Sequence, residues 1–70
     1  MTFQQALSVF TIAAQEEAAA MQELQRVEKA VSTGEVTRGD LADAYDLWLI
    51  AIGAKQRAEV ALARGSQLAA

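Results

Sequence analysis

One glycine-containing stretch near the middle of the chain limits what this sequence can fold into. The stretch is STGEVTRGD, residues 32–40, and the chain contains no proline. Glycine grouped with serine, threonine and aspartate marks a turn, whereas the flanking segments carry apolar residues at helical spacing. The sequence therefore predicts an all-α fold, an antiparallel two-helix hairpin. We expect helices at about residues 3–32 and 38–64 and a turn at about 33–37, in a single domain of residues 1–70.

Capping residues predict where the two helices begin and end. Thr2 is followed three residues later by Gln5, the capping-box spacing in which each side chain bonds the backbone amide of the other residue. Thr37 and Asp40 repeat this spacing before the second helix, where negative charge is also favoured by the helix dipole. Gly65 is a typical residue for a helix end, and we expect the second helix to stop there.

The first helix carries an apolar row with the alternating spacing of four and three residues that a two-helix seam requires. The row is Phe3, Leu7, Phe10, Ala14, Glu17, Met21, Leu24, Glu28 and Val31. Beside it run the smaller side chains of Ala6, Ala13, Ala20 and Val27, which can carry the contact where the glutamates interrupt the row. With two leucines of the second helix, the large members of the row form the expected hairpin core: Phe3, Leu7, Phe10, Met21, Leu24, Val31, Leu41 and Leu62. Whether the two glutamates are solvated or paired stays open.

The segment LWLIAIGA, residues 47–54, is apolar all round the helix. One stripe of the second helix can pack on the first: Leu41, Ala44, Tyr45, Trp48, Ile52 and Leu62. Leu47, Leu49 and Ile50 point elsewhere, and a hairpin has no third layer to cover them. Full burial of a leucine or isoleucine contributes about 1.5–3 kcal/mol, and a chain this short buries only roughly 60% of its surface unaided. We therefore expect a protein partner or a second copy to contact Tyr45, Trp48, Leu49, Ile50, Ile52 and Gly53.

Gly53 has two interpretations. It is either a tolerated glycine, at a cost of roughly 1 kcal/mol relative to alanine, or a place where another helix backbone approaches closely. The expected completion of the hairpin into a helical bundle, by self-association or by a partner, is compatible with both.

The residue types that most catalytic and metal sites need are missing from the sequence. It contains no cysteine and no histidine, which excludes zinc patterns and nucleophile–histidine sets. Asp40, Asp43 and Asp46 are spaced by threes, but two straight helices offer no cleft for acid–base chemistry, so we interpret them as solvated residues near a helix start. We expect no catalytic residue, no cofactor and no metal, and therefore a non-enzymatic protein.

Charge and hydropathy indicate which partners and which cellular compartment to expect. Six basic and nine acidic residues give a formal net charge of −3, and the absence of a basic cluster argues against a nucleic-acid partner. No segment reaches the about 18 apolar residues of a membrane span. The first ten residues, MTFQQALSVF, lack the basic start of a secretory signal. We therefore expect a cytoplasmic protein.

The stretch RGDLADAYDLW, residues 38–48, resembles the loop and early second helix of the small E-type co-chaperones of type III secretion needle subunits. The resemblance lies in Arg38-Gly39 at the turn, in Tyr45 seven residues after the arginine, and in Trp48 three residues further on. It implies a hairpin that joins a helical-repeat chaperone and keeps the needle subunit monomeric in the cytoplasm before export. It also implies a partner-facing strip of Tyr45, Trp48 and Ile52, with Phe3, Leu7 and Phe10 supporting the hairpin.

The residues leave two kinds of function open. One is a binding module for another protein, of which the secretion co-chaperone is the specific form. The other is a homodimeric four-helix bundle of two hairpins, which buries the apolar faces of four helices and serves as an adaptor or as a phage-type inhibitor of a host protein. The sequence decides neither the partner nor the oligomeric state.

Overall fold

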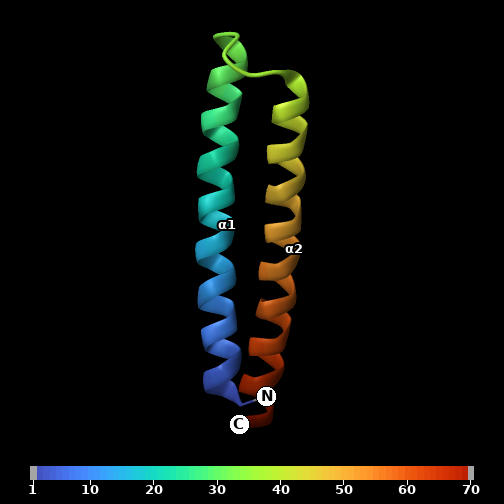
Figure 1. Ribbon diagram of the computed structural model, residues 1–70. Coiled ribbons are helices and arrows are strands. Elements are labelled where there is room, and N and C mark those ends of the chain that lie inside the picture. Colours follow the sequence, from blue (N-terminus) through green and yellow to red (C-terminus); the bar gives the residue numbers. More distant parts are fainter. Residues whose placement is uncertain (1, 70) are drawn as a thin grey trace.

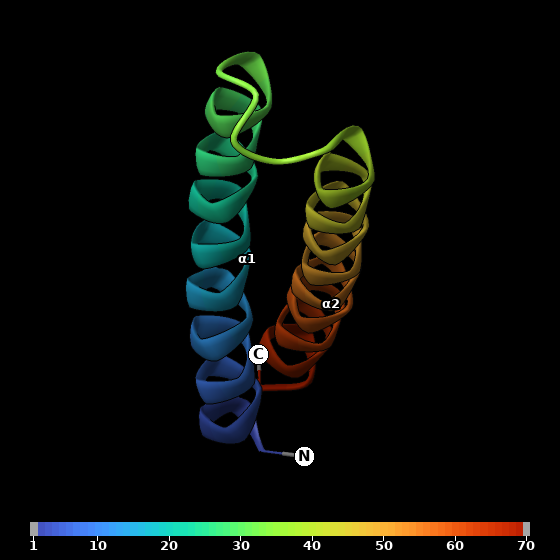
Figure 2. The same cartoon turned by 45° about the horizontal axis from the view of Figure 1, so that its top comes forward.

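The computed structural model describes residues 2–69, with side chains as far as Gly65, and over this range the chain forms two long helices. Helix α1 spans Phe3–Ser32 and helix α2 spans Arg38–Ala69. They run antiparallel, side by side, with one turn joining them at the far end from Phe3 and Ala69 (Figure 1, Figure 2). The hairpin is a narrow rod of 53 × 13 × 13 Å along its principal axes. The prediction of an all-α hairpin is confirmed.

Local hydrogen bonds explain why both helices begin where they do. The Thr2 amide donates to Gln5 Oε1 at 2.9 Å, and the Gln5 amide donates to Thr2 Oγ1 at 3.1 Å. At α2, the Thr37 amide donates to Asp40 Oδ2 at 3.0 Å and the Asp40 amide donates to Thr37 Oγ1 at 3.2 Å. Both predicted capping boxes are therefore present, and each satisfies amides that the first helical turn leaves without partners.

The turn closes α1 with a Schellman motif. The Gly34 amide donates to the Val31 carbonyl at 3.1 Å, and the Glu35 amide donates to the Ala30 carbonyl at 2.9 Å. This pairing requires a left-handed residue directly after the C-cap, and Gly34 supplies it with a φ of 79°. Of the two glycines in the turn-like stretch, only Gly34 is therefore part of the turn, because Gly39 lies in the first turn of α2.

Alanine fills most of the buried contact between the helices. The buried residues are Ala6, Ala13, Leu24, Val27 and Ala30 in α1 and Ala44 and Ala58 in α2. Towards the turn, Leu24, Val27 and Ala44 form a core cluster, against which Met21, Val31, Val36, Leu41 and Trp48 pack. Towards the termini, the buried residues in the described part of the chain are Ala6, Ala13 and Ala58. The small-residue row of α1 thus provides the centre of the seam rather than its flank.

The expected hairpin core matches this arrangement only in part. Leu24 is buried, whereas Met21, Val31 and Leu41 are half-buried at the edge of the core cluster, as are Phe10 and Leu62 elsewhere on the seam. Phe3 and Leu7 differ from the expectation, since they remain 41% and 39% exposed. The reason is that Ala6 and Ala13 face α2, which turns the larger side chains beside them to the edge.

Helix α2 also continues past its expected end, through Gly65 to Ala69. Gly65 does not adopt the left-handed conformation of a C-cap glycine, which among the described residues belongs to Gly34. A Cβ atom at Gly65 would lie 3.8 Å from Phe3 Cδ2 and 3.9 Å from Phe3 Cα. Gly65 therefore lies at the contact between α2 and the start of α1, where a Cβ atom would make an ordinary van der Waals contact.

Candidate interaction surface

The indole ring of Trp48 forms a hydrogen bond between the two helices. Its Nε1 atom donates to Glu17 Oε1 of α1 at 3.3 Å, and both side chains are half-buried. The ring also lies against Tyr45, with 5.6 Å between the ring centroids and a tilt of 52°. Glu17 is thus paired within the hairpin, while Glu28, the other glutamate of the apolar row, is exposed. Trp48 belongs to the hairpin contact as well as to the expected partner strip.

The six residues expected at a partner interface do not share one face. Tyr45 lines a hollow with Glu28 of α1, whereas Leu47 lines a different hollow with Glu23 and Arg26 of α1. These hollows lie along opposite edges of the hairpin. Helical spacing places Ile52, seven residues on, beside Tyr45, and Ile50, three residues on, beside Leu47. Tyr45, Leu49 and Ile50 are exposed, while Trp48, Ile52 and Gly53 are half-buried.

The edge that carries Leu47 holds the two most exposed large apolar side chains of those that the structure describes. Ile50 is 66% exposed and Leu47 is 61% exposed. On α1, the exposed Val9 and Ile12 stand two heptads before Glu23 and Arg26, which line the hollow beside Leu47. Both helices therefore contribute exposed apolar side chains to this edge.

A second heptad row runs along the outside of α2, and sequence reasoning missed it. It consists of Asp43, Leu47, Ile50, Ala54, Arg57, Ala61 and Arg64, with spacings that alternate between four and three residues. We call these seven residues the outer row. Its centre is apolar, its turn-proximal end is acidic and its other end carries two arginines. The spacing of these residues is visible in the sequence. It was missed because only the stripe that begins at Leu41 was considered on α2.

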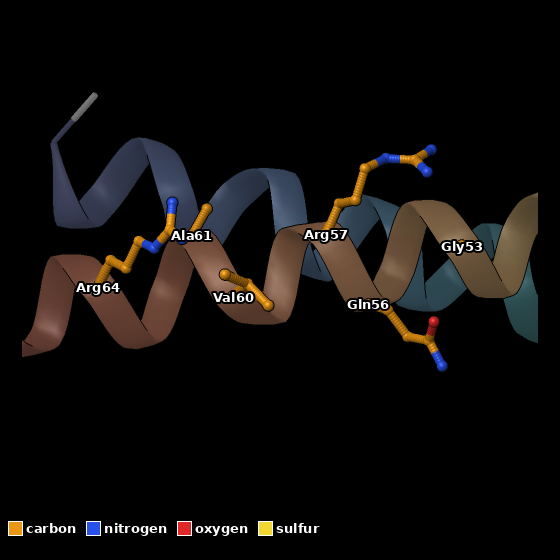
Figure 3. A pocket seen from close by; sticks show the side chains of 6 residues that line it. All are labelled: Gly53, Gln56, Arg57, Val60, Ala61 and Arg64. Atoms are coloured by element: carbon orange, nitrogen blue, oxygen red, sulfur yellow. The ribbon is translucent and has the colours of Figure 1, made fainter.

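The basic end of the outer row borders a shallow hollow on α2 (Figure 3). The hollow is lined by Gly53, Gln56, Arg57, Val60, Ala61 and Arg64, all from this helix. Arg57, Ala61 and Arg64 point to one side of the helix, and Gln56 points to the other. A Cβ atom at Gly53 would lie 3.4 Å from Arg57 Nη1, so the guanidinium folds back over the glycine.

Two ionisable groups on α1, Glu23 and Arg26, shift each other's pKa. Arg26, hydrogen-bonded to the Glu23 carboxylate, lowers the pKa of Glu23, and the same contact raises the pKa of Arg26. These two residues form an exposed ion pair three residues apart on α1, a surface arrangement rather than a tuned acid or base. Among residues 2–69, no group of three acidic side chains is gathered closely enough to hold a metal ion.

Comparison of the chain with protein-family models, curated proteins and solved structures gave no match. Within the described residues, neither helix has a stretch long and apolar enough to cross a membrane.

Proposed function

We propose that this chain is a non-enzymatic, cytoplasmic protein–protein interaction module that binds through the edge carrying Leu47 and Ile50. The observation that supports the proposal is that the buried residues between the helices are small, whereas several exposed residues are large and apolar. The buried seam is mostly alanine, whereas leucine, isoleucine and valine stand exposed along this edge. A protein that folded only for itself would gain more by burying the large side chains.

The free energy that burial of Leu47 and Ile50 would contribute is large enough to favour a partner that covers them. Leu47 and Ile50 each keep more than half of their surface in water. Covering the remainder would contribute about 1–2 kcal/mol for each residue. Apolar patches of this kind on a small soluble protein mark interaction sites or aggregation hazards.

A substitution pair tests the proposal. Leu47→Asp and Ile50→Asp should abolish capture of the protein that the wild-type chain binds, because each would bury a carboxylate in the contact. Gln25→Asp, an exposed change on the outside of α1, should leave binding intact. Each captured protein is then purified and its affinity measured by titration calorimetry. Retention by both aspartate variants, or no association of the wild-type chain with itself or any protein, would contradict the proposal.

A second candidate function is that of a co-chaperone of type III secretion. Its support is the resemblance of residues 38–48, in which Arg38 opens α2 and Tyr45 stands exposed near the turn. This function uses the opposite edge of the hairpin, so Tyr45→Ala should weaken binding of a helical-repeat chaperone while Ile50→Asp does not. The outer row favours a different partner, a second copy of this chain.

A further inference from the structure

We infer that the partner of the Leu47 edge is a second copy of this chain, bound antiparallel along α2 with a two-fold axis at Ile50. This inference deepens the proposed function and rests on it. It uses three features that the hairpin itself does not need: the spacing of the outer row, the order of its charges, and the hollow at Gly53.

The outer row has the periodicity of a helix-packing seam but lies on the outside of the hairpin. Seven residues spaced by four and three extend over most of α2, and this is the spacing with which one helix packs into another. The inner seam of α2 already uses a different set that includes Ala44 and Ala58. A second seam on the same helix is informative, since a two-helix hairpin requires only one.

Charge complementarity decides the orientation of the second copy. Asp43 and Arg57 each lie seven residues from Ile50, on opposite sides of it, or about 10 Å along the helix axis. Antiparallel pairing at Ile50 therefore sets Asp43 of each copy beside Arg57 of the other. Parallel pairing in register would instead set aspartate beside aspartate and arginine beside arginine, which repels. The outer row thus matches itself only when one copy is reversed.

The hollow on α2 provides the packing site that this pairing needs. Its six lining residues form two overlapping sets with the spacing of a knobs-into-holes socket, Gly53–Gln56–Arg57–Val60 and Arg57–Val60–Ala61–Arg64. Leu47 lies three residues before Ile50, and Gly53 lies three residues after it. Leu47 of the second copy is therefore level with Gly53 at the edge of the first set, where no Cβ blocks its approach, and Asp43 of the second copy is level with Arg57 within that set. Arg57, which folds over Gly53 in the single hairpin, would swing to Asp43 of the second copy and open the socket.

Helix α1 contributes to the same contact. Glu17 is level with Trp48 and Phe3 is level with Gly65, which places Ile12 level with Ala54. Ile12 is exposed on the edge that carries Leu47. In the antiparallel pair it meets Leu47 of the second copy, so that Ile12, Leu47 and Ile50 of both chains form one apolar centre. The result is a four-helix bundle with two helices from each copy.

Charge reversal tests the pairing in the full chain. Sedimentation of the wild-type protein over a roughly thousand-fold concentration range should show a monomer–dimer equilibrium. Asp43→Arg and Arg57→Asp should each raise the dimer dissociation constant about ten-fold, because each replaces two attractive pairs by two repulsive ones. The double variant should return to within about three-fold of wild type. Glu28→Arg, an exposed acid-to-base change beside the Tyr45 edge, is the matched control and should leave dimerisation unchanged.

Cysteine cross-linking reads the orientation directly, because the chain has no cysteine of its own. Ile50→Cys should form a disulfide-linked dimer on mild oxidation. Asp43→Cys alone should not, since the two residues would lie about 20 Å apart, but it should cross-link to Arg57→Cys when the two proteins are mixed. Circular dichroism confirms that each variant keeps its helices.

The outcomes separate this inference from the proposed function. A wild-type chain that stays monomeric at every concentration, a double reversal that is not rescued, or self-linking of Asp43→Cys would overturn the antiparallel dimer. If such a monomer still binds another protein in a manner lost with Ile50→Asp, the proposed function stands and the partner is different. If it binds nothing, both fail.

Discussion

Among the described residues, the bond between Trp48 and Glu17 is the one side-chain hydrogen bond that joins the two helices. It pairs two polar groups that are both half-buried, so removing one partner leaves the other poorly solvated. The bond also fixes which residues of α1 and α2 lie level with each other. A single residue pair therefore contributes to the register of the whole hairpin.

Trp48→Phe should destabilise the protein by about 1–2 kcal/mol, since a smaller aromatic ring stays but the donor to Glu17 is lost. The free energy of unfolding is measured by urea denaturation at one fixed protein concentration. Glu17→Ala in the same background should add little, because the interaction is already absent. Fully additive losses in the double variant would show that the hydrogen bond does not couple the two residues.

At the level of the helices, both starts and the end of α1 are determined by short-range chemistry. The capping boxes at Thr2 and Thr37 involve residues three apart, and the Schellman motif spans six residues around Gly34. Interactions over such distances are visible in a sequence, and both helix starts and the turn were predicted correctly for that reason. The end of α2 was not, because Gly65 faces Phe3, and a contact 62 residues away leaves no local signal.

Gly34→Ala should destabilise the hairpin by about 1 kcal/mol, because alanine strains the left-handed conformation that Gly34 adopts. Gly39→Ala is the matched control. It lies in the first turn of α2, and its new Cβ would make an ordinary 3.5 Å contact with Thr37 Oγ1. It should be neutral or slightly stabilising. Thermal unfolding followed by circular dichroism compares the two, and equal melting temperatures would contradict the prediction.

At the scale of the whole molecule, the seam between the helices could not be read from the sequence. Two neighbouring rows of α1 have heptad spacing, one with Phe3 and Leu7 and one with Ala6 and Ala13. Hydrophobicity favours burial of the row with Phe3 and Leu7, whereas close approach of two long helices favours burial of the row with Ala6 and Ala13. Which row is buried depends on the side chains of α2 that lie opposite. Since α2 presents Ala58 and Gly65 near the termini, the alanine row faces inward there. The same rotation moves Val9 and Ile12 toward the outside.

Ala13→Leu should destabilise the hairpin by about 1–3 kcal/mol, because the extra methyl groups have no room in a seam built from alanine. Ala18→Leu adds the same side chain at an exposed position of α1 and should leave stability nearly unchanged. Urea denaturation distinguishes the two variants. A similar small effect for both would mean that the helices are not closely packed at Ala13.

Because the contact between the helices consists mostly of alanine, alanine scanning cannot identify the residues that stabilise it. Of the seven buried residues among those that the structure describes, five are already alanine, so a conventional alanine scan removes nothing from most of this interior. Its strong responses would fall instead on edge and surface positions such as Trp48, Leu47 and Ile50. For this fold, a scan that enlarges side chains reports on the inside, and one that shrinks them reports on the outside.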